Sequence, residues 1–420
     1  MGNGLCVETS SSWTVFDWLD KVLGSVGSYA GLGKLRNDDD FTDRLSHHYT
    51  TMLLVIFTIV VSTKQYVGDA IQCWCPAQFT EAHVNYANQI CWVSNTYHVP
   101  MENVIPTNPD QRRETMLTYY QWVPFILLFM GILFKLPRIL WKALTFSSAI
   151  SLDKVVSLIY ALQMSPKVER DEKLAEVTDY IDTWLISSEQ YREVCCFPLK
   201  QKVSKYSCFV CGRRYGNFFI TSAIIVKFLY FTNAFLQYFA LNAFLGDDFA
   251  AWGFEIITGL ADENPDYMKL SPRFPRVTLC DFQIRQMNNV QRWTVQCVLP
   301  INLFNSKIFL FIWFWLVFLC ISSLMTLCAT FYATMFPARR VDFIRKYLTL
   351  RRVVPFRGEG ERRLIRRFVM SYLRFDGFYV LRVAAHNATD ILTAQVIENL
   401  YRKFKQRRVE SKDLNGGEYV

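Results

Sequence analysis

Four long apolar runs constrain this chain more than any other feature of its sequence. They cover residues 49–66, 119–140, 218–245 and 308–336. About twenty consecutive apolar residues can cross a hydrocarbon core of roughly 30 Å as a helix. The runs also explain why 51% of the 420 residues are apolar, a high share for a soluble protein. The sequence therefore predicts an all-α membrane protein with four transmembrane helices.

The charges between the runs predict which side each segment occupies. Residues 141–216 hold 11 Lys and Arg against 9 Asp and Glu, and residues 337–420 hold 19 against 9. Residues 67–118 hold 2 against 5, and residues 244–306 hold 5 against 7. By the positive-inside rule, the first two segments are cytoplasmic and the other two are extracellular. Residues 1–45 are net acidic and point the other way, but four spans place both termini on one side.

This topology divides the chain into nine parts. In chain order they are a cytoplasmic N-terminal segment (1–45), the first span (46–67), extracellular loop 1 (68–118), the second span (119–140), a cytoplasmic loop (141–216), the third span (217–245), extracellular loop 2 (246–306), the fourth span (307–336) and a cytoplasmic helical region with a tail (337–420). Because residues 1–45 contain no apolar core of a signal peptide, the first span is expected to serve as an uncleaved signal.

The second run begins with a distinctive hexapeptide. It consists of Tyr119, Tyr120, Gln121, Trp122, Val123 and Pro124. The three aromatic side chains predict a belt at one membrane interface, and Lys135, Arg138 and Lys142 mark the other end as cytoplasmic. Pro124 lacks a backbone donor and is expected to kink or loosen the first turn of this helix.

Five cysteines lie in the two segments that are expected outside the cell. They are Cys73, Cys75 and Cys91 in the first segment and Cys280 and Cys297 in the second. Disulfides are the expected state on the oxidising side of the membrane. Four of these cysteines, all but Cys75, allow three pairings, and spacing alone does not choose among them. Cys75 either stays a buried thiol or competes with Cys73 for a partner.

Several stretches resemble the innexin family, the gap-junction proteins of invertebrates. The matching stretches are the hexapeptide, the acidic lead into the first span (38–50), the outer cysteine segments (68–100 and 274–297), the third-span segment 226–237 and the aromatic run 311–315. These motifs occur in the family's order, and the resemblance covers roughly residues 14–345.

The resemblance implies a large-pore channel whose loops are joined by disulfides. Cys73 and Cys91 would be bonded to Cys280 and Cys297. Subunits, eight per hemichannel and either identical or from other innexin-like chains, would ring a pore, and two hemichannels would dock between adjacent cells. Such a protein passes ions and small molecules at a cell–cell junction of the plasma membrane. An undocked hemichannel that releases small solutes, and a non-conducting junctional adhesion or scaffold protein, remain alternatives.

A short helix is predicted over residues 13–23, ahead of the first span. It lies flat on the membrane as an amphipathic helix, or, as the family resemblance implies, folds into the pore mouth. In the second case Trp13, Asp17 and Asp20 would line the pore, and a ring of carboxylates would favour cations.

Lys227 is a charge within the third apolar run. It lies about 15 Å along the helix from Asn217, and a lone ammonium at that depth is expected to face the bundle or water. The sequence leaves open whether its ammonium snorkels, bonds backbone oxygens or has a packing role. Asp38, Asp39 and Asp40 are interpreted as a solvated stretch that leads into the first span.

The remaining polar segments are predicted to be helical. Helical spacing relates Val155, Leu158, Ile159 and Leu162, and again Leu174, Val177, Ile181 and Leu185. Four inner cysteines, Cys195, Cys196, Cys208 and Cys211, favour reduced thiols or palmitoylation over a metal site. The basic tail sits under anionic lipid, forms the solvated face of a helical domain that ends near Lys405, or binds calmodulin. The aromatic fourth span is expected to face lipid.

The sequence holds none of the common nucleotide-binding, zinc-protease or serine-hydrolase motifs. We therefore expect no enzyme, no cofactor and no metal. Membrane lipid is an expected partner, and topology excludes nucleic acid.

Overall fold

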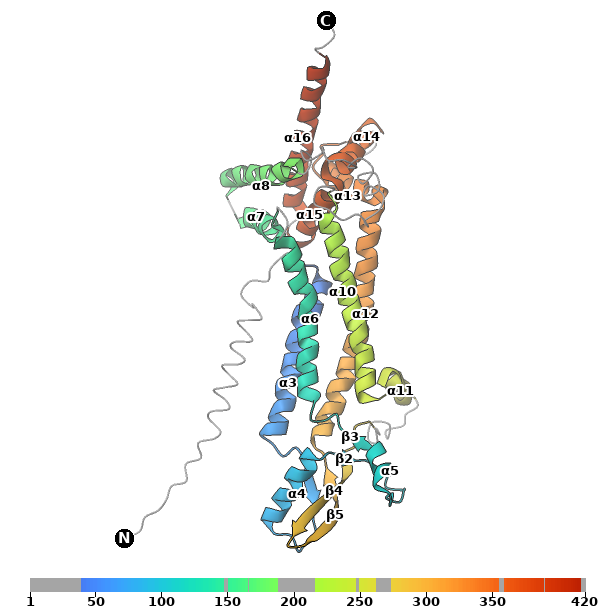
Figure 1. Ribbon diagram of the computed structural model, residues 1–420. Helices are drawn as coiled ribbons and strands as arrows, with labels where there is room; N and C mark the ends of the chain where they lie inside the picture. The colour runs from blue at the N-terminus through green and yellow to red at the C-terminus, as the bar shows by residue number, and fades with distance from the viewer. Residues whose placement is uncertain are drawn as a thin grey trace, which may run out of the picture. The chain divides into compact units, whose positions relative to one another are not determined.

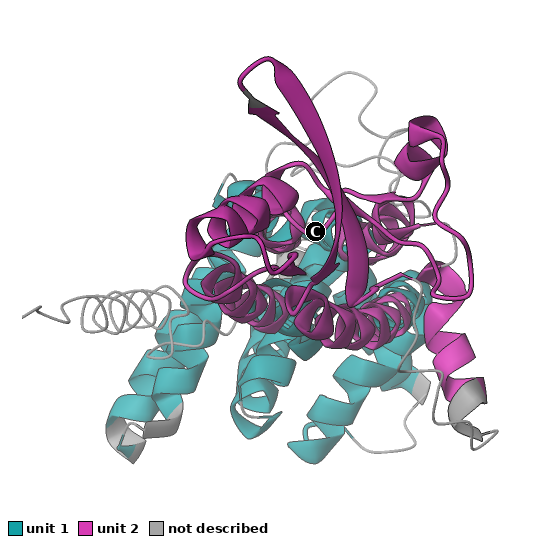
Figure 2. Ribbon diagram, turned by 90° about the horizontal axis from the view of Figure 1, so that it is seen from below, with its two compact units in different colours: residues 1–48, 137–228, 325–420 teal, residues 49–136, 229–324 magenta. Residues whose placement is uncertain are grey.

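The computed structural model describes residues 39–146, 150–164, 166–187, 216–246, 249–261, 273–354, 359–388 and 390–416. The chain forms two compact units, which Figure 2 distinguishes by colour. Unit 1 comprises Met1–His48, Pro137–Phe228 and Met325–Val420, and unit 2 comprises Tyr49–Leu136 and Leu229–Leu324.

Among the described residues, four helices are long and apolar enough to cross a membrane. They are Phe41–Tyr66, α6 (Val123–Phe146), α10 (Phe218–Leu245) and α12 (Ile301–Met335). The first consists of α2 (Phe41–Arg44), a π-helical segment η1 (Leu45–Tyr49) and α3 (Thr50–Tyr66). Pro124 is the second residue of α6. The N–H groups of a first helical turn have no acceptor within the helix, so the missing N–H of Pro124 breaks no hydrogen bond and does not produce the expected kink. The proline inside this helix is Pro137.

Unit 2 contains a five-stranded sheet that the sequence analysis did not predict. Its strands are β1 (Gln72–Trp74), β2 (Thr96–Tyr97), β3 (Met116–Leu117), β4 (Val277–Gln286) and β5 (Asn289–Val298). Their order is β1-β5-β4-β2-β3, and every pair is antiparallel. The long β4–β5 hairpin from the second outer segment is thus flanked on both sides by short strands from the first.

The described part of unit 2 also contains three shorter helices (Figure 1). They are α4 (Glu81–Val93), α5 (Pro109–Glu114) and α11 (Phe249–Ala261). The side chain of Thr80 caps the first turn of α4, and this helix packs against β1 and β4. Buried Ala87 and Cys91 lie on one face of α4, four residues apart, as expected for the side that a helix turns toward a sheet.

Unit 1 contains a bundle of helices (Figure 1). Its members are α7 (Leu152–Met164), α8 (Lys167–Ser187), α13 (Pro337–Leu350), α14 (Glu359–Arg367), the π-helical η4 (Phe368–Leu373), α15 (Arg374–Asn387) and α16 (Asp390–Gly416). Helix α15 is the centre of the bundle, since nine of its residues are buried. Gly377 permits this packing, because a Cβ there would lie 2.9 Å from Leu185 Cδ2.

The helical spacing read from the sequence is confirmed in α7 and α8. Val155, Ile159, Val177 and Ile181 are all fully or nearly fully buried. In the tail, Ile365 is buried and Leu364 is half-buried between the basic pairs, while Arg362 and Arg363 are exposed. The tail thus contains a helical domain with an exposed basic face, and whether solvent, anionic lipid or calmodulin contacts that face stays a prediction. That domain continues beyond Lys405, because α16 ends at Gly416.

Candidate functional site

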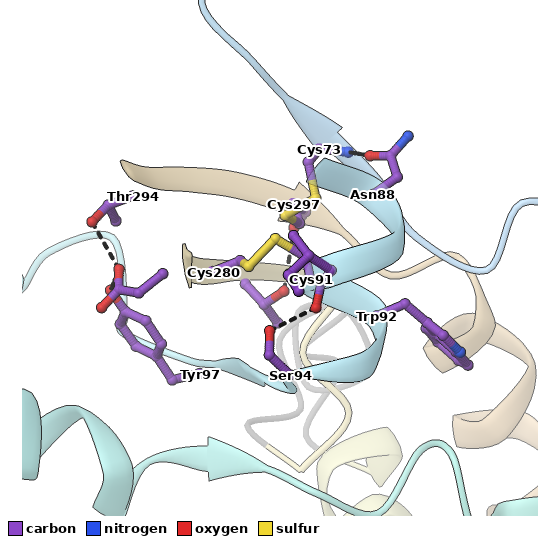
Figure 3. The surroundings of a disulfide bond; sticks show 12 residues. Cys73, Asn88, Cys91, Trp92, Ser94, Tyr97, Cys280, Thr294 and Cys297 are labelled. Carbon is purple, nitrogen blue, oxygen red and sulfur yellow. Dashed lines mark hydrogen bonds between the residues drawn. A yellow bond between two sulfur atoms is a disulfide. The ribbon is translucent and has the colours of Figure 1, made fainter. Parts of the chain in front are cut away.

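Two disulfide bonds join the two outer segments of unit 2. They link Cys73 to Cys297 and Cys91 to Cys280, as Figure 3 shows. Cys73 and Cys297 are direct partners across β1 and β5, whereas Cys91 reaches β4 from the last turn of α4. The bridged residues are 224 and 189 positions apart in sequence. Bridges over such long loops typically stabilise a fold by about 2–4 kcal/mol each, mainly by constraining the unfolded chain.

The two bridges lie against each other. The Sγ atoms of Cys73, Cys91 and Cys297 are all within 4.8 Å of one another. All three sulfurs are engaged in disulfides, which removes the thiolates that a metal ion would need. Among the described cysteines of this region, Cys75 keeps a free, partly exposed thiol, and burial raises its pKa. The alternative in which Cys75 takes the partner of Cys73 is wrong, because Cys297 is bonded to Cys73.

A half-buried acceptor, Asp281, ties the hairpin to the first outer segment. Its Oδ2 accepts a hydrogen bond from Arg112 Nη1 at 2.6 Å, and its Oδ1 accepts from the Tyr97 hydroxyl at 3.0 Å. Thr294, on the neighbouring strand, donates to the same Oδ1 at 2.7 Å. Burial and the nearby Asp281 carboxylate raise the pKa of Tyr97 to about 12. The phenol therefore stays neutral and remains a donor.

The hexapeptide joins α6 to the outer segments. The Tyr119 hydroxyl donates to the backbone oxygen of Arg273 at 2.9 Å, and the Tyr120 ring lies 4.9 Å from that of Trp92. Gln121 Nε2 donates to the backbone oxygen of Trp92. Tyr119 and Tyr120 are buried. The prediction that all three aromatic residues face the membrane interface is thus wrong for Tyr119 and Tyr120, because the outer segments cover them.

Trp122 is the exposed member of the hexapeptide, with 59% of its surface accessible. It lines a shallow cavity of about 230 Å³. The other lining residues are Gln65, Tyr66, Trp92, Val93, Gln121 and Phe125. An indole that is apolar on its ring and polar at its N–H suits a membrane interface, so the interface position of Trp122 stays a prediction.

Lys227 is buried and paired with two carboxylates. Its Nζ lies 2.6 Å from Asp40 Oδ2 and 2.9 Å from Asp43 Oδ2, and the lysine side chain is 4% exposed. Neither snorkelling nor bonding to backbone oxygens describes this arrangement. Asp43 lies in the first turn of the Phe41–Tyr66 helix, so Lys227 reaches the level at which that helix begins.

Asp39, the residue before Asp40, makes ionic contacts of its own. Asp39 is 6% exposed, and its Oδ1 accepts a hydrogen bond from Arg138 Nη1. His47 Nε2 lies 3.0 Å from Asp39 Oδ2. The interpretation of this acidic stretch as solvated is therefore wrong for Asp39 and Asp40, because their partners come from α6, α10 and η1. We call Asp39, Asp40, Asp43, Arg138 and Lys227 the ionic cluster.

Another buried carboxylate, that of Asp376 in α15, caps the start of α10. Its two oxygens accept hydrogen bonds from the backbone N–H groups of Phe218 at 2.8 Å and Ile220 at 3.2 Å. The Asp376 N–H donates to the backbone oxygen of Gly216, whose φ of 70° suits glycine. Burial raises the pKa of Asp376 to about 7, although the hydrogen bonds from α10 act in the opposite direction.

Comparison with known proteins adds to this geometry. The family model described as Innexin matches residues 39–404. The chain belongs to the innexin family. It is 36% identical to Innexin unc-9 of Caenorhabditis elegans over 367 residues, which cover 87% of this chain and 92% of that protein. It is 35% identical to Innexin-3 of the same nematode over 387 residues, covering 91% and 88%. Innexin eat-5, also from C. elegans, is 30% identical over 398 residues, covering 92% of each chain.

Innexins assemble into oligomeric channels that dock across cells. This innexin is accordingly a gap-junction channel subunit of the plasma membrane, with four membrane-spanning helices and disulfide-linked outer segments. The matched region contains all four disulfide-bonded cysteines, the hexapeptide, Lys227 and Asp376.

Some residues that the sequence singled out lie outside the described part of the innexin. They are the pore-mouth candidates Trp13, Asp17 and Asp20 and the inner cysteines Cys195, Cys196, Cys208 and Cys211.

Asp281, Arg112 and Asp376 were missed by sequence reasoning. For Asp281 a signal exists, because β-branched and aromatic residues are frequent on both sides of the short turn at Met287, as in two paired strands. Nothing in the local sequence of Asp376 indicates that its partners are backbone groups more than 150 residues away.

Proposed function

We propose that this innexin forms hemichannels of eight subunits that dock through the β4–β5 hairpin and conduct ions and small molecules. The observation that carries the proposal is the disulfide-linked sheet: both bridges anchor the base of the hairpin, so that its tip is held in a defined place. Met287 at the tip is fully exposed, with 100% of its surface accessible. A rigid projecting element loses little conformational entropy on docking.

The sidedness that we propose follows the charges of the chain. Unit 2, which holds the sheet, faces the extracellular space, and the helical bundle of unit 1 faces the cytoplasm, where its many Arg and Lys residues favour an anionic inner surface. Disulfides are stable on the outer side and rare on the inner one. The proposed role is that of a channel and not of an enzyme.

The pore mouth is proposed to carry Trp13, Asp17 and Asp20. Rings of carboxylates, one from each subunit, would attract cations. Replacing Asp17 and Asp20 by Asn should reduce the preference of the current for cations, measured as a reversal potential under a salt gradient. An unchanged reversal potential would remove these residues from the pore.

Paired cells that lack other junction proteins test the function as a whole. The chain expressed in both cells should produce a junctional current, which Cys280→Ser should abolish. Cys75→Ser is the matched control, because this thiol lies in the same region and bonds no other cysteine; its current should persist.

The two alternative functions, an undocked hemichannel and a non-conducting adhesion protein, would give different currents in the same experiment. Current across single membranes without a junctional current would indicate an undocked hemichannel. Protein at the contact without any current would indicate an adhesion protein or a subunit that requires a different innexin. Counting subunits in purified hemichannels, by single-particle imaging, tests the number eight.

A further inference from the structure

Helix α11 folds back along α10 instead of continuing away from it. Gly246, with φ of 111°, follows the last residue of α10, and its N–H donates to the backbone oxygen of Asn242. The Asn242 side chain then accepts a hydrogen bond from Ala250 N at 2.8 Å. The Tyr238 hydroxyl donates to the backbone oxygen of Ala250 at 2.7 Å. The start of α11 therefore lies beside the last two turns of a membrane-spanning helix.

The same helix rests on the apolar part of α12. Gly253 allows a close approach, since a Cβ at this position would lie 2.3 Å from Trp313 Cε3. Trp313 Nε1 also donates to the backbone oxygen of Ala250, at 3.3 Å. Trp313 lies about 9 Å further along α12 than Lys307, at 1.5 Å per residue. Helix α11 thus contacts α12 past the last charged residue at that end of the helix.

The outward face of α11 is apolar and exposed. The side chains of Phe254 and Ile257 are 59% and 50% accessible. From Phe249 to Thr258 the helix is apolar but too short to cross a membrane. Its one carboxylate in that stretch, Glu255, points to Arg273, with 3.5 Å between Oε2 and Nη1. The helix is thus apolar, too short to span and held on its other side by α10 and α12, so its exposed face can enter only one leaflet.

Ring contacts connect this face to the exposed surfaces of the spans. Phe254 lies 5.0 Å from the Trp313 ring, which in turn lies 4.9 Å from Phe314. Trp313 also lies 6.1 Å from Tyr238, and Tyr238 lies 5.5 Å from Phe239. Phe239 and Phe314 are 49% and 39% exposed. The surface of α11 is therefore continuous with apolar surface on α10 and α12.

We propose that α11 is an interfacial membrane helix, with Phe254 and Ile257 inserted among the acyl chains of the leaflet nearest the sheet. Lipid is the occupant that this continuity favours, because the adjoining rings belong to two helices that cross the bilayer. The inference goes beyond conduction and docking, and it requires only the four spans.

A photocrosslinker at the exposed ring tests the proposal. Phe254→p-benzoylphenylalanine keeps an aromatic side chain at this position in the full-length protein. After irradiation of native membranes, mass spectrometry should find phospholipid on the subunit at this position. Val104→p-benzoylphenylalanine is the control, since Val104 is 91% exposed in the first outer segment; it should gain no lipid. A subunit–subunit crosslink at position 254, or lipid at neither position, would overturn the proposal.

An accessibility measurement gives an independent test. In a Cys75→Ser background, Ile257→Cys and Val104→Cys are treated on intact cells with a membrane-impermeant maleimide. The thiol at 257 should react at least about tenfold more slowly than the one at 104, because lipid excludes the charged reagent. Equal rates would place the outward face of α11 in water and contradict the proposal. Neither readout depends on current, so a silent channel leaves this test intact.

Discussion

The ammonium of Lys227 lies 2.6 Å from Asp40 Oδ2, although 187 residues separate the two in sequence. A charge in the third apolar run is thereby neutralised by the segment that leads into the first.

Replacing Lys227 by Met should destabilise this innexin strongly. The substitution removes the ammonium that contacts both Asp40 and Asp43, and breaking a buried pair typically costs about 3–5 kcal/mol. We expect a lower melting temperature of the detergent-solubilised protein and less of it at the cell surface. Lys173→Met is the control, because its pair with Glu169 is exposed and should be worth less than about 0.5 kcal/mol. Equal effects of the two substitutions would show that the ionic cluster contributes little.

The disulfide pairing predicts a difference between two double substitutions. Cys91→Ser with Cys280→Ser removes one bridge, whereas Cys91→Ser with Cys297→Ser breaks both and leaves two thiols unpaired. Loss of one bridge typically costs about 2–5 kcal/mol. Surface biotinylation should therefore recover clearly more of the first variant than of the second. If both reach the surface equally, the pairing described here is not the one in the mature protein.

Asp281→Asn should loosen the base of the hairpin. The change leaves Arg112 without its anion, and a hydrogen bond to a charged group is worth about 1.5–3 kcal/mol. The junctional current should fall and the melting temperature should drop. Asp110→Asn is the matched control: Asp110 also pairs with an arginine, but the pair is exposed and 3.4 Å long, so little should change. A normal melting temperature for Asp281→Asn would contradict this account.

Asp376 makes the stability of the protein depend on pH. Its folded-state pKa, about 7, is raised above the value near 3.9 that an unfolded aspartate has. The protonated side chain therefore favours the folded state fully below about pH 4, and this contribution is lost as the pH rises through about 7. The full effect is on the order of 4 kcal/mol.

Two variants isolate this carboxyl from other titrating groups. Asp376→Asn cannot ionise, so the fall in its melting temperature between pH 5 and pH 8 should be smaller than in the unchanged protein. Asp342→Asn serves as the control, since it alters a carboxyl outside the capped start of α10 and should leave the pH profile as it was. A steeper fall for Asp376→Asn would mean that the ionised form is the one that the fold favours.

Gly253→Ala should disturb the packing of α11 against α12. The added methyl would overlap the Trp313 ring, and overpacking of this kind typically costs about 1–3 kcal/mol. Gly360→Ala places the same methyl in a helix where no atom lies within 4 Å, and it should be neutral or slightly stabilising. Thermal unfolding of the two proteins compares them directly. Similar melting temperatures would indicate that α11 moves away from α12 without cost.

The order of apolar and polar residues along the chain was enough to predict the helices, whose formation depends on residues that are close in sequence. Long apolar runs identify the spanning helices, and helical spacing identifies α7 and α8. The oxidising side of the membrane was enough to expect disulfides, and the family resemblance narrowed their pairing to the two outer segments.

What local pattern missed depends on partners that are distant in sequence. Nothing near Asp39 or Asp40 reveals that Arg138 and Lys227 will neutralise them, so an acidic stretch looks solvated. The fourth span was expected to face lipid because it is aromatic on all sides. Phe309 and Trp313 are instead buried. The turn at Gly246 brings α11 back onto α12, where Gly253 packs against Trp313 and contributes to its burial.

The strand order of the sheet has a consequence for how the protein is made. β5 lies inside the sheet, yet it is the last of the five strands to leave the ribosome. At about 5–20 residues per second, the 224 positions from Cys73 to Cys297 take roughly ten to forty-five seconds to synthesise. Throughout that interval Cys73 waits in the oxidising lumen without its partner, where oxidoreductases and chaperones can act on it. The sheet can therefore close only after Cys297 has been synthesised.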